Sequence, residues 1–277
     1  MNPYQFIFEN IVPERQEMLI ALLANIGFDG FEEDDKALKA FIPTATFDED
    51  MFHDVIELID IKYSKSILEE VNWNQRWETG FEPVIVPHPT SLAAFAAVRA
   101  NFHAVIPGVP YDLLVTPKMS FGTGHHATTY LMMQQMSLLD FNSKEVIDFG
   151  TGTGVLAILA EKLGATKITA IDNDEWSINN SIENIDANSC TNIIIVKGET
   201  IEAGITADII LANINLNIII GNLEAIKTAC KTGTSILISG IMQKDEEEII
   251  TLLKENNFII KTCLEKDNWL IILARTE

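Results

Sequence analysis

An aspartate and three glycines stand close together near the middle of the chain. The segment 148–154 reads DFGTGTG and joins an apolar, strand-like run to a helical pattern. Glycines at such a turn let a ligand approach the backbone, and the first N–H groups of the helix are free to donate. A dinucleotide fingerprint has the spacing G-x-G-x-x-G, whereas the third glycine here comes one residue early. We therefore expect Gly150, Gly152 and Asp148 to bind a cofactor without a pyrophosphate, with a charged amine beside Asp148.

Two more polar side chains end strand-like segments further along. Asp172 follows the apolar segment 167–171, and an acid at this place can accept hydrogen bonds from ribose hydroxyls. Asn213 follows 207–212, and in an open α/β sheet that strand ends beside the first one, where ligands bind. Each alone could instead cap the next helix. Together with the glycine turn they indicate a nucleoside cofactor, S-adenosylmethionine or NAD, and Asn213 could hold an attacking amine.

A loop upstream reads FGTGHHATT over residues 121–129. Its glycines make it flexible, and we expect its first residues to fold over the cofactor; these are Phe121, Gly122 and Thr123. His125 and His126 are neighbours without a third ligand nearby, so we expect no metal site.

The segments around these residues alternate between strand and helix. Strands are predicted at 145–149, 167–171, 192–196, 207–212 and 234–239, and helices at 155–163, 174–188, 216–230 and 244–256. This order predicts a mostly parallel, doubly wound sheet. The closing pair, 258–264 and 268–274, has no helix between its members, which predicts one antiparallel strand at the end.

The first 60 or so residues predict a small α+β unit. Strands are expected at 4–9, 28–33, 37–42 and 61–68, and helices from Pro13 and over 48–60. The order βαββαβ is that of a ferredoxin-like domain. The connector after it, 69–81, carries Trp73 and Trp77 four residues apart. We interpret it as a linker helix docked on one domain, with a substrate-contacting role as the alternative.

Length and charge limit the function classes. The 277 residues fit one large or two unequal domains. The net charge of −21 argues against a protein that grips nucleic acid through its phosphates. No window reaches the length of an apolar membrane span, and the first residues lack the pattern of a signal peptide. Three cysteines without a paired spacing favour a reducing compartment, so we expect a cytoplasmic protein.

The sequence resembles the PrmA-type ribosomal protein methyltransferases, which modify large-subunit protein L-eleven. The resemblance covers essentially the whole chain. It is carried by NWNQRW at 72–77, VRANFH at 98–103, FGTGHHATT at 121–129, DFGTGTG at 148–154, ANI at 212–214 and SGI at 239–241.

That resemblance implies three parts: a ferredoxin-like substrate-recognition domain (1–65), a linker helix (66–81) and a seven-stranded, Rossmann-like class I methyltransferase domain (82–277). It implies S-adenosylmethionine as cofactor, with contacts from Thr129, Gly150, Asp172 and Asn213. The implied reaction methylates lysine side-chain and N-terminal amines of a ribosomal protein. We expect that substrate to be basic and the protein to act as a monomer.

The sequence also allows other functions. The chain could be a class I methyltransferase for another protein or a small molecule, or a binding module that kept the fold. The glycine spacing disfavours a dehydrogenase. Residues 1–80 hold 17 acidic and 6 basic side chains. This excess leads to the hypothesis that the first domain steers a basic substrate electrostatically.

Overall fold

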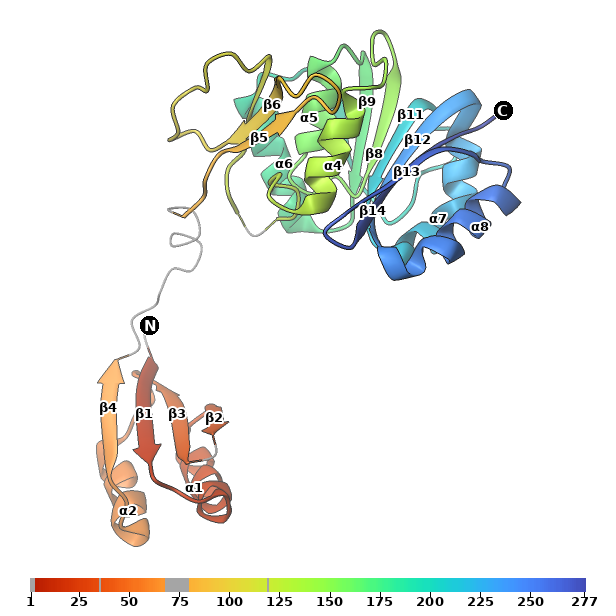
Figure 1. Ribbon diagram of the computed structural model, residues 1–277. Coiled ribbons are helices and arrows are strands. Elements are labelled where there is room, and N and C mark those ends of the chain that lie inside the picture. The colour runs from red at the N-terminus through yellow and green to blue at the C-terminus, as the bar shows by residue number, and fades with distance from the viewer. Residues whose placement is uncertain (1–2, 35, 68–79, 119) are drawn as a thin grey trace. The chain divides into compact units, whose positions relative to one another are not determined.

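The computed structural model describes residues 3–34, 36–67, 80–118 and 120–277, and the chain divides into two compact units, Met1–Trp73 and Asn74–Glu277 (Figure 1). The linker helix predicted over 66–81 falls mostly on residues 68–79, which lie outside the described part. Its first two residues instead end a strand of the first unit, because Ser66 and Ile67 pair with β1.

The first unit follows the predicted element order. Its elements are β1 (Pro3–Glu9), α1 (Pro13–Asn25), β2 (Gly30–Asp34), β3 (Ala37–Pro43), α2 (Glu49–Ile59) and β4 (Tyr63–Ile67). The strands form an antiparallel sheet in the order β2-β3-β1-β4. Alternate residues of β1 and β3 face the helices, so that Phe6 and Phe8 are fully buried with Leu19 and Leu23. Asp48 starts α2 by accepting the N–H groups of Asp50 and Met51.

The second unit is built on a mixed seven-stranded sheet in the order β10-β9-β8-β11-β12-β14-β13. The strands are β8 (Glu145–Phe149), β9 (Lys167–Asp172), β10 (Ile193–Lys197), β11 (Ala207–Asn213), β12 (Cys230–Met242), β13 (Ile259–Lys266) and β14 (Trp269–Arg275). The strands β8 to β12 run parallel, and β14 is antiparallel to both of its neighbours. The chain order reverses between β8 and β11, which is where open α/β sheets bind ligands.

The antiparallel strand predicted at the end is β14, the last strand of the chain. The short turn after β13 folds β14 back between β12 and β13, because β14 is the more apolar strand and is covered on both faces. Four of its residues are buried, whereas β13 is mostly half-buried or exposed. The edge position therefore falls to the more polar member of the pair.

Helices cover both faces of this sheet (Figure 1). They are α4 (Ala127–Met136), α5 (Val155–Lys162), α6 (Glu175–Ala187), α7 (Leu216–Ala229) and α8 (Glu246–Glu255). The first three pack in one apolar core with Ile168, Leu211 and Leu237. The last two pack in another with Ile147 and Ile210. None of the helices in the described ranges is long and apolar enough to cross a membrane.

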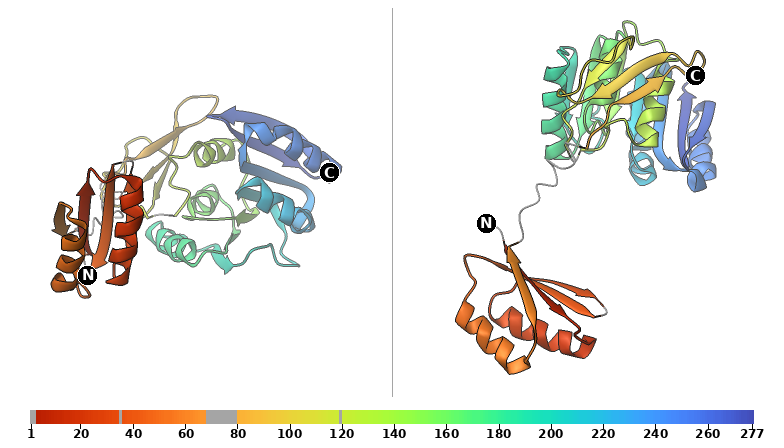
Figure 2. Two further views of the ribbon diagram at one scale, coloured as in Figure 1. Left: turned by 90° about the horizontal axis from the view of Figure 1, so that it is seen from below. Right: turned by 60° about the vertical axis from the view of Figure 1, so that its left-hand side comes forward.

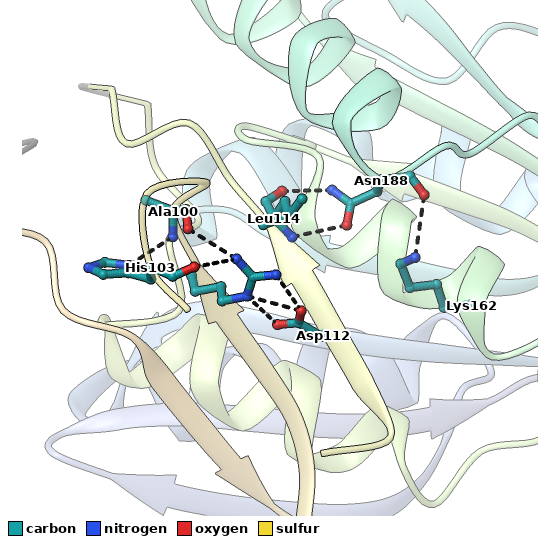
Figure 3. A network of polar contacts seen from close by, with 7 residues as sticks. Ala100, His103, Asp112, Leu114, Lys162 and Asn188 are labelled. Atoms are coloured by element: carbon teal, nitrogen blue, oxygen red, sulfur yellow. Dashed lines mark hydrogen bonds and ion pairs between the residues drawn. The ribbon is translucent and has the colours of Figure 1, made fainter. Parts of the chain in front are cut away.

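A three-stranded sheet that the sequence reading missed precedes α4. It consists of β5 (Val84–Pro87), β6 (Ala94–Arg99) and β7 (Tyr111–Leu114). Figure 2 shows it in yellow, beside α4 and α5. Arg99 joins two of its strands, since the guanidinium donates from Nε and Nη2 to the Asp112 carboxylate at 2.7–3.0 Å (Figure 3). The last strand of this small sheet ends at Leu114, seven residues before Phe121 begins the 121–129 loop.

Candidate functional site

The glycine turn follows β8 and is fixed by its neighbours. The N–H groups of Gly150 and Thr151 both donate to the Ile171 carbonyl, at 2.8 and 2.9 Å. Gly152 has φ +56°, and a Cβ there would lie 2.4 Å from the Phe121 carbonyl oxygen. A side chain at Gly152 would therefore push the upstream loop away from the turn.

Asp172 holds the other side of this turn. Its Oδ2 accepts the N–H of Gly152 at 2.9 Å, and its Oδ1 accepts the N–H of Asp174 at 3.0 Å. The alternative role as a helix cap is wrong, because α6 is capped by Asp174, which accepts the N–H of Ser177. Each oxygen of Asp172 keeps a lone pair for a further donor.

A cleft of about 490 Å³ opens at the carboxyl ends of β8, β9 and β11. The sequence predicted five of its wall residues as site residues: Phe121, Gly150, Gly152, Asp172 and Asn213. Other wall residues were not predicted from the sequence, among them Asn173, Ser177, Gly198 and Glu199. Gly198 and Glu199 follow β10 directly, so the rule that ligands meet the carboxyl ends of parallel strands could have found them.

Asn213 is buried in the cleft wall, and only the nitrogen of its side-chain amide has a hydrogen-bond partner among the described residues. Nδ2 donates to the Thr129 hydroxyl at 3.2 Å, while Oδ1 has no hydrogen-bond partner among the described residues. Its side chain does not cap the following helix, since Asn215 does so by accepting the N–H of Ile218. A buried acceptor without a partner is costly unless a ligand or water supplies the donor. Asn213 can thus accept a hydrogen bond from a bound molecule.

Four predicted cofactor contacts are not in the cleft wall: Thr129, Gly122, Thr123 and Asp148. Thr129 is fully buried, and its hydroxyl oxygen accepts the hydrogen bond from Asn213 Nδ2. The Gly122 carbonyl accepts the Thr153 hydroxyl at 2.7 Å, which ties the loop to the glycine turn. Thr123 Oγ1 lies 3.2 Å from His125 Nδ1. In this arrangement these residues support the wall rather than form it.

Asp148 is fully buried beneath the glycine turn. Its Oδ2 accepts the Thr151 hydroxyl at 2.6 Å and the Ala157 N–H at 3.2 Å. Its Oδ1 is without a partner in the described part of the chain. Burial raises the pKa of Asp148 to about 6, against the opposing effect of the Thr151 hydrogen bond. The expected amine beside Asp148 remains a prediction.

A row of aromatic rings runs outward from the cleft. Phe121, half-exposed in the wall, meets His126 edge-on with ring centroids 5.1 Å apart, and His126 meets Trp269 in the same way at 4.9 Å. Trp269 begins β14 opposite Met242, at the carboxyl end of β12. The sequence reading gave no role to Trp269, because it is distant along the chain. Such a row of rings offers an apolar wall beside the cleft.

The two neighbouring histidines have separate surroundings. His126 caps α4, with Nδ1 accepting the Thr128 N–H at 3.4 Å, whereas the His125 ring packs against Phe81. In residues 3–34, 36–67, 80–118 and 120–277, no group of three or more His, Cys, Asp or Glu side chains is placed to hold a metal ion.

A family profile and curated relatives of this chain carry the same name. The profile described as ribosomal protein L11 methyltransferase (PrmA) matches residues 12–277. The ribosomal protein L11 methyltransferase of Porphyromonas gingivalis is 36% identical over 266 residues, covering 91% of this chain and 88% of that protein. The protein of the same name from Chlorobaculum tepidum is 34% identical over 288 residues, covering 99% and 96%.

A solved structure agrees in fold. The ribosomal protein L11 methylase from Lactobacillus delbrueckii subsp. bulgaricus has a TM-score of 0.62 at 25% identity, over 70% of this chain and 99% of that one. The family profile, by contrast, matches from residue 12 in the first unit through the glycine turn to the residues after β14. The chain belongs to the ribosomal protein L11 methyltransferase (PrmA) family.

Proposed function

We propose that this protein transfers methyl groups from S-adenosylmethionine to amines of ribosomal protein L11, on lysine side chains and the N-terminus. The observation that carries the proposal is the buried Oδ1 of Asn213, which lines the cleft and lacks a partner in the described residues. An amine that has a proton to donate and a lone pair to react with suits this position. The choice of L11 as the substrate rests on the names of the family and of the relatives.

The cleft residues fit the nucleoside part of S-adenosylmethionine. Asp172 would accept the ribose hydroxyls with the lone pairs left after its two backbone bonds. Glu199 could accept the exocyclic amine of adenine, and Ile171 and Ile218 offer apolar surface to its ring. Gly150 and Gly152 let the ligand lie against the backbone. When bound, S-adenosylmethionine supplies an electrophilic methyl group on a sulfonium.

The protein must present a neutral amine in line with that methyl group. Free lysine has a pKa near 10.4, so most of it carries a proton at neutral pH. An apolar wall raises the free energy of the charged form and thus favours the neutral amine. Phe121, His126 and Trp269 offer such a wall beside the cleft. Asn213 Oδ1 would then accept one amine N–H and direct the lone pair toward the methyl group.

The two units suggest a division of labour. The element order and the strand order of the first unit, β2-β3-β1-β4, are those of a ferredoxin-like domain, which would recognise the substrate protein. Residues 82–277 would form the class I methyltransferase domain. The protein would act as a monomer and without a direct hold on nucleic acid. A ribosomal substrate would place it in the cytoplasm.

The proposal is tested by labelling a bacterial lysate. The purified protein is incubated with methyl-labelled S-adenosylmethionine and the lysate, and labelled bands are identified by mass spectrometry. We expect ribosomal protein L11 as the main labelled band, with label on amines. Label on a different protein would show that L11 is not the substrate. Label on a small molecule would show that the protein is not a protein methyltransferase. A binding module would leave all bands unlabelled.

A further inference from the structure

Three asparagines four residues apart, at 180, 184 and 188, join α6 to the last residue of β7 and to the segment after it. Asn188, which ends the helix, exchanges two hydrogen bonds with Leu114: its Oδ1 accepts the N–H at 2.9 Å and its Nδ2 donates to the carbonyl at 2.6 Å (Figure 3). One turn earlier, Asn184 Oδ1 accepts the Thr116 N–H at 2.7 Å. Asn180 Nδ2 donates to the Thr116 carbonyl at 3.3 Å. The three side chains thus replace the partner strand that this segment lacks in the small sheet.

Asn184 also contacts the glycine turn. Its Nδ2 donates to the Thr153 carbonyl at 2.8 Å, and the side chain is fully buried. Thr153 in turn holds the upstream loop at two points. Its N–H donates to the Phe121 carbonyl at 2.9 Å, and its hydroxyl donates to the Gly122 carbonyl at 2.7 Å. One buried amide therefore connects the stem of the loop, the glycine turn and the cleft residue Phe121.

The position suits an amide side chain. It must offer an acceptor to the N–H of the half-buried Thr116 and, at the same time, a donor to the carbonyl of the buried Thr153. A primary amide does this without charge. An apolar replacement would leave both backbone groups without that partner, at a cost of about 1–3 kcal/mol for each buried group.

We infer that Asn184 is a positioning residue for methyl transfer, which acts through Thr153 to hold Phe121 and Gly122 against the cofactor cleft. The inference rests on the proposed function of that cleft. Asn184 does not line the cleft itself, so its effect on cofactor affinity must pass through the turn and the loop. The sequence predicted a helix over 174–188 but gave no role to its asparagines.

Asn188 provides a matched control. Its side chain bonds to Leu114, the last residue of β7, and to the Asn184 carbonyl of the helix, and none of these bonds involves the glycine turn. Asn184→Ala and Asn188→Ala each remove hydrogen bonds to that segment, and we expect both to lower the melting temperature. Only Asn184→Ala should weaken binding of S-adenosylhomocysteine in calorimetry, by about tenfold for one lost hydrogen bond, and lower kcat.

Two more variants separate positioning from general destabilisation. Asn184→Asp keeps the acceptor for Thr116 and removes the N–H that donates to Thr153, so we expect it to weaken binding as much as Asn184→Ala. Thr153→Ser keeps the hydroxyl that donates to Gly122, whereas Thr153→Val removes it. The effects of Asn184→Ala and Thr153→Val on the binding free energy should be less than additive, because both loosen the same loop.

The outcomes distinguish this inference from the proposed function. If the wild-type protein fails to bind S-adenosylhomocysteine, the proposed function is wrong. If the wild-type protein binds and transfers methyl groups, but Asn184→Ala matches Asn188→Ala in affinity and kcat, the inference about Asn184 is wrong. Strict additivity with Thr153→Val would also contradict it.

Discussion

Asn213 and Asp172 both line the cleft, but their side chains make different hydrogen bonds. Asp172 uses both carboxylate oxygens to fix backbone N–H groups and lines the cleft beside Ser177. Asn213 uses its N–H side to bind Thr129 and leaves its oxygen available. In the proposed function, Asp172 therefore binds the cofactor, and Asn213 accepts a hydrogen bond from the reacting amine.

Removal of the Asp172 carboxylate should reduce cofactor affinity more than stability. In Asp172→Ala the ribose loses a charged acceptor and Gly152 loses the group that holds its N–H. Hydrogen bonds to charged groups contribute about 1.5–3 kcal/mol, so we expect the Kd for S-adenosylhomocysteine to rise about 10- to 100-fold. The control is Asp174→Ala, which removes the cap of α6 and should lower stability at unchanged affinity. Equal affinities for both variants would remove Asp172 from the site.

The buried carboxyl group of Asp148 should make stability depend on pH. Burial raises the pKa of Asp148 to about 6 from an ordinary 3.8, so the folded protein holds this proton more tightly than the unfolded chain. Folding is therefore favoured below about pH 4, and this contribution is lost as the pH rises through 6. Relative to Asp148→Asn, the wild-type unfolding free energy should fall by up to about 3 kcal/mol from pH 4 to 7. Urea unfolding of both proteins tests this, and a constant difference would contradict it.

At the scale of elements, sequence periodicity predicted most of the second unit. The apolar segments that became β8, β9, β10 and β11 are short and flanked by turns, and their helices carry a clear apolar face. The place of β14 inside the sheet was not predicted, because it depends on which strand of the closing pair is better covered. The small sheet β5-β6-β7 was missed, because its strands are short and separated by proline-containing loops.

The site was predicted where strand ends carry distinctive residues and missed where distant segments meet. Gly150 directly follows β8, and Asp172 and Asn213 are the last residues of β9 and β11. The asparagines of α6 resemble an ordinary polar helix face, and only the fold brings them to residues 114–116. Trp269 likewise reaches His126 from the other end of the domain.

The bulge in β12 is an element that should matter for the cleft. Gly240 has φ +82°, and a Cβ there would lie 2.5 Å from the carbonyl oxygen of Ile214, the residue after Asn213. Gly240→Ala should displace Ile214, lower kcat at least tenfold and reduce stability by about 1–3 kcal/mol. Steady-state kinetics and thermal unfolding measure both.

Gly221 gives the matched control for this substitution. It lies in α7 on an exposed turn, and a Cβ there meets none of the described atoms within 4 Å. Gly221→Ala should therefore leave kcat unchanged and stabilise the helix by up to about 1 kcal/mol. The role given to the bulge is wrong if both alanine variants keep wild-type kcat.

At the scale of the whole molecule, the first 80 residues are more acidic than the rest of the chain. Residues 1–80 carry 17 acidic and 6 basic side chains, a larger excess per residue than in the rest of the chain. Several of the acids lie on β2 and at the start of α2, including Glu32, Glu49 and Asp50. A surface of this sign attracts a basic protein and speeds encounter at low salt.

Neutralising these acids should slow substrate capture without changing the chemical step. Replacement of Asp34, Asp35, Asp48, Glu49 and Asp50 by their amides should lower kcat/KM for L11 and weaken its salt dependence, with kcat unchanged. Asp48→Asn keeps a capping side chain for α2. The control replaces Glu246, Glu247 and Glu248 of α8 by Gln. If both sets change kcat/KM alike, the acidic surface has no steering role.

The most direct test of the central claim is the intact mass of purified L11 after incubation with S-adenosylmethionine and either wild-type protein or Asn213→Ala. We predict mass increments of whole methyl groups with the wild-type protein, located on amines by fragmentation. We predict at least a hundredfold slower gain with Asn213→Ala, although that variant still binds S-adenosylhomocysteine. An unmodified substrate with wild-type protein, or equal rates for the two proteins, would contradict the account.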